Sequence, residues 1–314
     1  MRKYAVLLLL LLLSACTDNP SNVQTWGGLG SAHGQFNEPF DVAVDTQGFV
    51  YVTDVRNNRV QKFTTDGDFV LAFGQGLFEK PAGIAIAPDD TVWVTDYDLD
   101  KVFHFDNKGK LITAWGKAGD KLGEFESPVD IAVNAKGLVY VVDQYHHRIQ
   151  TFSPDGHFIS TWGKQGKVNV VRSALNFLIS DNHKGEFYYP SRIAIGFDDL
   201  VYVSDAYNNR VQVFDSQGGF VRSIGGMGLW GGRFRVSSGI AVDADNHLFV
   251  ADFYNNRIQQ FDDEGRFIKA WGSKGVEQGE FSGPTGVAAS RDGKVYITDW
   301  GNHRIQRFVI HSDS

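Results

Sequence analysis

The stretch DAYNNRVQVFD, residues 205–215, returns 47 residues later as DFYNNRIQQFD, residues 252–262. Looser versions of the same phrase begin at four other aspartates: Asp54, Asp96, Asp143 and Asp299. The six leading aspartates are 42, 47, 62, 47 and 47 residues apart along the chain. Periods of about 40–50 residues are typical of propellers and solenoids, so the sequence predicts one structural unit repeated six times.

Each repeat predicts four short strands. In the first repeat they are expected at Asp41–Val44, Phe49–Thr53, Arg59–Phe63 and Phe69–Phe73, with turn-forming residues between them. Four antiparallel strands per repeat, arranged around an axis, form a blade of a β-propeller. The middle of the first strand is alanine in all six copies, at positions 43, 85, 132, 194, 241 and 288. A small side chain suits the strands that crowd together nearest the axis.

The last repeat lacks its fourth strand, because the chain ends soon after RIQRFVIH, residues 304–311. A matching segment, VQTWG at residues 23–27, precedes the first repeat. We therefore expect an all-β fold, a six-bladed β-propeller of four-stranded antiparallel blades. Its ring would be closed by an N-terminal strand, which leaves no open sheet edge.

A recurrent charge pair is expected to hold the hairpin of each blade. Asp54 precedes Arg59 by five residues, and four other repeats keep this spacing. A hairpin of that length brings both ends together and predicts a cross-strand ion pair. The Asn residues at the loop centre tolerate positive φ. The second repeat departs from the pattern, with Lys101 in place of arginine.

The segments EPFDVAV, VYVTD and NNRVQKF, together with the Trp-Gly end of the fourth strand, resemble the NHL repeat family. The resemblance covers about residues 23–310 and implies a six-bladed propeller. It does not imply one function, because that family includes RNA-binding, protein-binding, sensor and lyase members.

The first sixteen residues, MRKYAVLLLLLLLSAC, have a basic start and an apolar run that is too short to span a bilayer. The ending LSAC resembles a bacterial lipobox, which implies cleavage before Cys16 and lipidation of that cysteine. An ordinary cleaved signal that ends in cysteine is the alternative. Thr17 follows instead of aspartate, which in such lipoproteins favours the outer membrane of the cell envelope.

These features give the expected domain organisation. Residues 1–15 are a signal peptide, 16–22 the lipidated cysteine and tether, and 23–314 the propeller. An insertion at about 167–185 lengthens the connection into the fourth blade, and its apolar spacing favours a short helix, with a mobile loop as the alternative. The net charge of −7 and the signal peptide argue against nucleic acid as a partner.

Candidate site residues are expected where the repeats differ, on the face that carries the connections between blades and the hairpin loops. We call this the top face, and the face with the remaining turns the bottom face. The candidates near the channel mouth and past the second strands are Asp41, Arg56, Tyr97, Asp130, Tyr145, Arg192, Tyr207, Phe253, Tyr254 and Trp300. Clustered aromatic residues suit contact with a protein or a glycan.

Two interpretations of function follow. The first is a lipid-anchored binding scaffold whose top face meets a protein or glycan of the envelope, with no cofactor. The alternative is a metal-assisted lyase or hydrolase at the channel mouth, where Arg192 would hold a substrate carboxylate. Asp41 and Asp130 are weak calcium ligand candidates. Zinc is not expected, because the nine histidines are not predicted to converge.

Overall fold

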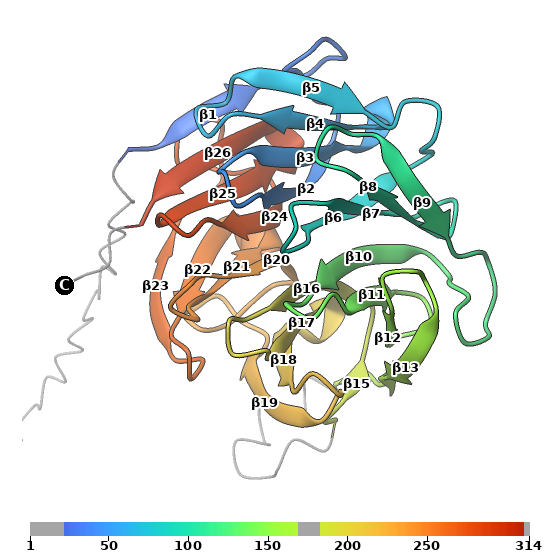
Figure 1. Ribbon diagram of the computed structural model, residues 1–314. Helices are drawn as coiled ribbons and strands as arrows, with labels where there is room; N and C mark the ends of the chain where they lie inside the picture. The colour runs from blue at the N-terminus through green and yellow to red at the C-terminus, as the bar shows by residue number, and fades with distance from the viewer. Residues whose placement is uncertain (1–21, 169–182, 311–314) are drawn as a thin grey trace, which may run out of the picture.

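The computed structural model of the protein describes residues 22–168 and 183–310, and six four-stranded antiparallel sheets stand around one axis (Figure 1). Three blades come first in the chain. Blade 1 consists of β2 (Pro39–Val44), β3 (Val50–Asp54), β4 (Arg59–Phe63) and β5 (Phe69–Phe73). Blade 2 consists of β6 (Pro81–Ile86), β7 (Val92–Asp96), β8 (Lys101–Phe105) and β9 (Leu111–Trp115). Blade 3 consists of β10 (Pro128–Val133), β11 (Val139–Asp143), β12 (Arg148–Phe152) and β13 (Phe158–Trp162).

The second half of the ring repeats this order. Blade 4 consists of β16 (Pro190–Ile195), β17 (Val201–Asp205), β18 (Arg210–Phe214) and β19 (Phe220–Gly225). Blade 5 consists of β20 (Ser237–Val242), β21 (Leu248–Asp252), β22 (Arg257–Phe261) and β23 (Phe267–Trp271). Blade 6 consists of β24 (Pro284–Ala289), β25 (Lys294–Asp299), β26 (Arg304–Val309) and β1 (Gln24–Gly27).

The N-terminal strand closes the ring, as the sequence predicts. β1 pairs antiparallel with β26, with Gln24 opposite Arg307 and Gly27 opposite Arg304. The Gln24 side chain donates to the carbonyl of Asp66 in a bottom turn of blade 1, so the chain enters the propeller from the bottom face. The sheet order β1-β26-β25-β24 mixes the two ends of the chain in one blade.

Aromatic side chains join neighbouring blades. The outermost strand of one blade places a ring against a phenylalanine of the next blade, as in Trp115–Phe152 and Trp162–Phe214, with ring centroids 4.6 and 4.4 Å apart. Trp26 of the closing strand makes the same kind of contact with Phe63 of blade 1. Such pairs contribute roughly 0.5–1.5 kcal/mol beyond the burial of their area. This contact explains the Trp-Gly ending of blades 2, 3, 5 and 6; blade 1 has Phe73 and blade 4 has Ile224 at the same position.

The innermost strands pack side by side around the axis, and each contacts the innermost strand of both neighbouring blades. The alanines predicted to relieve this crowding lie opposite a large residue of the second strand, as Ala43 does with Tyr51. Helix is nearly absent from the described residues, which include one-turn 3-10 helices in hairpin loops, such as η3 (Ala206–Asn208) and η4 (Phe253–Asn255).

Several predicted features lie outside the described residues. They include Cys16, most of the tether and the expected helix in the blade 4 insertion. On either side of residues 169–182, β14 (Lys164–Gln165) and β15 (Glu186–Phe187) form a short parallel pair. Within residues 22–168 and 183–310, no helix has both the length and the hydropathy of a membrane span.

Candidate functional site

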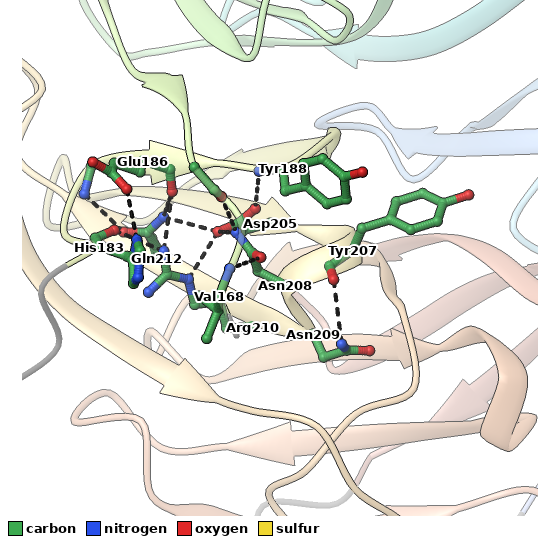
Figure 2. Close-up of polar contacts among 12 residues, drawn as sticks. Val168, His183, Glu186, Tyr188, Asp205, Tyr207, Asn208, Asn209, Arg210 and Gln212 are labelled. Carbon is green, nitrogen blue, oxygen red and sulfur yellow. Dashed lines mark hydrogen bonds and ion pairs between the residues drawn. The ribbon is translucent and has the colours of Figure 1, made fainter. Parts of the chain in front are cut away.

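The repeated phrase builds a hydrogen-bonded network in each hairpin, shown for blade 4 in Figure 2. Asp205 Oδ2 accepts from Arg210 Nε at 2.8 Å, from Asn208 Nδ2 at 2.9 Å and from Gln212 Nε2 at 3.1 Å. Arg210 and Gln212 also donate to the carbonyl of Glu186, in the connection that leads into the blade. We call this the hairpin network; it fixes both the hairpin and the incoming connection.

The predicted Asp–Arg pair is present in five blades. The Nε–Oδ2 distances are 2.8, 2.7, 2.8, 2.8 and 2.7 Å for Asp54–Arg59, Asp143–Arg148, Asp205–Arg210, Asp252–Arg257 and Asp299–Arg304. In blade 2, Lys101 is exposed and Asp96 instead accepts backbone N–H groups, including those of Glu79 and Leu99. A network that recurs five times is structural, so the hairpin phrase does not mark a functional site.

Three of the predicted site residues converge on the axis. Arg192 of blade 4 reaches across to the opposite blade 1, where its Nη2 donates to the Phe40 carbonyl at 3.1 Å and its guanidinium lies 4.2 Å from the Phe40 ring centroid. Its Nε lies 3.7 Å from Asp41 Oδ1. The Asp130 carboxyl lies close enough to Asp41 for the negative charge of Asp41 to raise its pKa. Phe40, Asp41, Asp130 and Arg192 together form what we call the axial plug.

Burial raises the pKa of both acids in the axial plug. Asp41, Asp130 and Arg192 are each at most 5% exposed. Burial raises the pKa of Asp130 well above its usual range, and the negative charge of Asp41 raises it further. Burial also raises the pKa of Asp41, against which the Arg192 charge acts. One arginine thus faces two acids, and the upward pKa shift is the stronger for Asp130.

The plug closes the channel toward the top face. The other three blades have glycine at the equivalent position of the innermost strand. A Cβ on Gly83 would meet Asp130, and a Cβ on Gly286 would meet Asp41. The lyase or hydrolase alternative placed substrate here, but the three side chains are buried and contact one another and backbone groups. Among their polar atoms Arg192 Nε has no hydrogen-bond partner in the described residues and lies 3.7 Å from Asp41 Oδ1. Arg192 already supplies a positive charge beside Asp41, so we do not propose calcium at this position.

The channel is open at the bottom face instead. A cavity of about 690 Å³ lies there, walled by the ends of the innermost strands at Val44, Ile86, Val133, Ile195 and Val242. Turn residues such as Thr46, Asn134 and Phe197 form its rim. The turn signals in the sequence predicted only turns at this face and gave no indication of the cavity.

Aromatic side chains do gather on the top face. Tyr145, Tyr207 and Tyr254 occupy the same loop position in blades 3, 4 and 5 and are 45%, 58% and 57% exposed. The equivalent position of blade 1 holds Arg56, which is exposed and pairs with Glu38 at 3.0 Å. The top face is therefore aromatic over blades 3–5 and charged over blade 1.

The other three predicted aromatics are half-buried and support their neighbours. The ring centroids of Tyr97 and Tyr145 lie 6.3 Å apart, and the rings meet edge to face. Phe253 lies 4.9 Å from Tyr254 and 6.3 Å from Trp300. These rings pack between hairpins of adjacent blades, so their side chains present less surface to a partner than the three exposed tyrosines.

Two further tyrosines complete this surface and were missed by the sequence analysis. Tyr189 lies 5.5 Å from both Tyr145 and Tyr207, and Tyr188 lies 6.2 Å from Tyr207 (Figure 2 shows Tyr188 and Tyr207). We call Tyr97, Tyr145, Tyr188, Tyr189 and Tyr207 the tyrosine arc. The signal was available: between Phe and Pro, blade 4 has Tyr-Tyr where blades 1–3 have Asn-Glu, Glu-Lys and Glu-Ser.

His147 positions the centre of the arc. Its Nδ1 accepts the backbone N–H of Tyr189 at 3.0 Å, and its ring lies 4.7 Å from the Tyr189 ring. Burial lowers the pKa of His147, with a further contribution from His146. The neutral imidazole is therefore the form that the fold requires, because a protonated Nδ1 cannot accept this hydrogen bond.

Comparison with protein families identifies NHL repeats at residues 36–63, 125–152 and 281–308, and a 6-bladed beta-propeller model matches residues 182–270. The chain thus carries NHL repeats within a six-bladed propeller. Fifty residues are 42% identical to protein brain tumor of Drosophila melanogaster, a match that covers 16% of this chain and only 5% of that protein.

Solved structures share the fold. A streptogramin B lyase is 15% identical, with a TM-score of 0.61 over 94% of this chain and 90% of that one. A gluconolactonase of Xanthomonas campestris is 14% identical, with a TM-score of 0.64 over 89% and 88%. A chain from a nidogen/laminin complex is 17% identical, with a TM-score of 0.56 over 76% and 82%. At these identities the likeness shows the fold alone.

Proposed function

We propose that this protein is a lipid-anchored binding scaffold of the cell envelope and that its tyrosine arc binds a partner protein. The observation that carries the proposal is the unequal top face. The tyrosine arc spans blades 2–4 and Tyr254 follows in blade 5, whereas the equivalent loop position holds Arg56 in blade 1 and Gly301 in blade 6. Side chains that are not required in every blade to form the ring are candidates for binding a partner.

The physical character of the arc fits a protein contact. Tyrosine combines a large apolar ring with a hydroxyl and has only two side-chain torsions to fix on binding. The rings are already held by one another, which reduces the entropy that a partner must offset. The matches to NHL repeats and to a chain from a protein complex support a binding role.

The orientation of the rings favours a protein over a glycan. The Tyr145–Tyr189 and Tyr189–Tyr207 pairs meet at interplanar angles of 82° and 65°. These rings therefore stand edge to face and form no flat platform on which a sugar ring stacks. A protein side chain can instead insert between such edges, and the hydroxyls remain available as hydrogen-bond donors.

The proposal is tested by capture of envelope proteins on the purified chain. We expect the double substitution Tyr145→Ala, Tyr207→Ala to weaken capture of the specific partner at least about tenfold, the effect of losing two central aromatic contacts. Phe197→Ala is the matched control, because Phe197 is 59% exposed but lies at the bottom cavity. Unchanged binding by the tyrosine variant, or equal loss in both variants, would contradict the proposal.

The membrane anchor is tested separately. Cys16 lies outside the described residues, so its lipidation is part of the proposal and rests on the lipobox-like LSAC. We expect Cys16→Ser to move the protein from the membrane fraction to the soluble fraction and to abolish metabolic labelling with palmitate. Membrane recovery and labelling equal to those of the natural sequence would exclude this anchor without affecting the tyrosine arc.

A further inference from the structure

One bottom turn differs from the others in the chemistry of its side chains. In blade 5 the turn Asp243–His247 brings a ligand atom from each of Asp243, Asp245 and His247 within 4.8 Å of one another. His247 Nδ1 lies 3.1 Å from Asp243 Oδ2. These residues line a hollow that shares Ser290 with the wall of the bottom cavity.

A buried side-chain amide in the same hollow has an oxygen without a hydrogen-bond partner among the described residues. Gln260, on β22, lines the hollow with Asp243 and His247 and is only 5% exposed. Its Oε1 has no hydrogen-bond donor among the described residues. Leaving a buried carbonyl oxygen unpaired costs about 1–3 kcal/mol, so such an oxygen indicates a ligand.

Blade 1 shows how an equivalent turn is satisfied without a ligand. There Asp45 Oδ2 accepts from the Tyr51 hydroxyl at 3.1 Å and lies 3.5 Å from Lys62 Nζ. Blade 5 replaces that tyrosine by Phe249 and that lysine by Gln260. Both partners of the carboxylate are lost together, and a carbonyl oxygen and an imidazole take their place.

We propose that Asp243, Asp245, His247 and the Gln260 carbonyl oxygen bind a divalent first-row transition-metal ion, such as Zn²⁺ or Mn²⁺. Carboxylate, imidazole and amide oxygen together suit these ions, whereas Ca²⁺ prefers oxygen ligands alone. Ligands at about 2.0–2.2 Å from an ion lie at most about 4.4 Å apart. The exposed Asp245 side chain can close the remaining distance by rotation, without movement of the backbone.

The charged residues that line the hollow are three acids, Asp243, Asp245 and Asp292, and three bases. Lys294 is paired with Asp292 at 2.5 Å, so its charge is already balanced. Lys269 and Arg291 also line the hollow and limit the affinity. The ion would lie beside the bottom cavity and would not contact the axial plug, so the site is independent of the proposed top-face function.

Metal titration of the purified full chain, without a histidine tag and after chelator treatment, tests the proposal. Calorimetry with ZnCl₂ and MnCl₂ should give one ion per chain for at least one metal, with Kd well below about 1 mM. Asp245→Asn and His247→Phe should each weaken binding at least about tenfold. His247→Phe introduces the residue that blade 1 has at this position, Phe49, so the turn itself should fold.

The matched control is Asp198→Asn, which changes the equivalent turn position of blade 4. Its Kd should equal that of the natural sequence. With Co²⁺ as probe, visible absorption should appear in the natural sequence and in Asp198→Asn but not in His247→Phe. No binding up to about 1 mM, or the same Kd in Asp245→Asn as in the control, would overturn the site.

Discussion

The hairpin networks and the axial plug both bury aspartate beside arginine, but they solve the problem of charge differently. In each hairpin network one aspartate faces one arginine, and other N–H donors, such as the side-chain amides of Asn208 and Gln212 in blade 4, bind to the carboxylate as well. In the axial plug two aspartates face one arginine, and burial raises the pKa of Asp130 well above its usual range. The first arrangement recurs in five blades; the second occurs once because only blades 1, 3 and 4 supply its charged residues.

The difference shows that repetition and charge balance go together. Each repeated aspartate is neutralised by an arginine of its own hairpin, so the charge of the pair does not depend on a neighbouring blade. The plug draws on opposite sides of the ring and is balanced only when the ring is closed. Loss of a partner should therefore be costly in the hairpin network and should depend on pH in the plug.

The largest effect is expected from Asp54→Asn. This change leaves Arg59, which is 5% exposed, without the carboxylate that lies 2.8 Å from its Nε. Removing one member of a buried ion pair costs about 3–5 kcal/mol. Asp96→Asn is the contrast, since the equivalent Lys101 is exposed; both Asp96 oxygens accept backbone N–H groups, so it should cost about 1–3 kcal/mol. Chemical denaturation measures both, and equal losses would mean that the arginine charge is not what Asp54 balances.

A smaller effect of opposite sign is expected from Asp130→Asn. The raised pKa of Asp130 means that the native state favours the protonated acid, so stability is lost as pH rises from the usual value of 3.8 toward the native value. Asparagine can accept from Ile193 N–H and donate to Asp41 without that loss. We expect a gain of about 1–2 kcal/mol at pH 8 and almost none near pH 4.

Thermal melts from pH 4 to pH 8 measure this difference, and Asp41→Asn is the contrast. That variant should show no gain at pH 8, because Asp130 must then ionise to balance Arg192. A stability difference between Asp130→Asn and the natural sequence that stays constant with pH would show that Asp130 is ionised in the native plug.

A third effect concerns pH and the tyrosine arc. Because the pKa of His147 is lowered, the stability that its neutral form provides is present above pH 6.5 and is lost as pH falls through the native pKa. Partner binding through the arc should weaken about two- to fivefold between pH 7.5 and pH 5.5, corresponding to at most about 1 kcal/mol. His147→Asn, which restores the usual loop residue, should remove this pH dependence. The same pH profile of partner binding in His147→Asn and in the natural sequence would show that His147 does not control binding by the arc.

The smallest effect is expected from Lys101→Arg, which restores the arginine in blade 2. In blade 1, Arg59 Nη2 also donates to the carbonyls of Ala32 and Gln35 in the incoming connection. Gly74 precedes Lys101 by 27 residues, whereas Gly27 precedes Arg59 by 32, so the blade 2 connection is too short to offer the same loop. The free energy of unfolding should change by less than about 0.5 kcal/mol. A gain above 1 kcal/mol would show that the ion pair acts without the loop.

Much of this architecture could be predicted from the sequence because each blade repeats its local rules. The expected strands Arg59–Phe63 and Phe69–Phe73 agree with β4 and β5 to the residue. β2 begins at Pro39, two residues before the expected start, because Pro39 pairs with Asp54 across an irregular register. Local turn and strand signals do not report such a bulge.

The candidate site was harder to predict because it depends on distances across the ring. Asp41, Asp130 and Arg192 were expected near the channel mouth, but only the structure shows that Arg192 crosses to Phe40 and buries all three. Tyr189 was missed because it precedes a proline in a connection, where the hairpin pattern gives no information. The contacts of Tyr189 with Tyr145 and Tyr207 join a connection to the hairpin loops of two blades, and they depend on how the blades pack rather than on spacing in the sequence.

The closing strand also has a consequence for the order of biosynthesis. Gln24 of β1 is translated 280 residues before its neighbour strand begins at Arg304. At about 5–20 residues per second, β1 waits roughly 15–55 seconds for its partner. During this time five blades can form, while β1 remains an unpaired strand and a risk for misassociation. Completion of the ring therefore needs the last strand of the chain, and a chain cut short before Arg304 would leave blade 6 open and β1 unpaired.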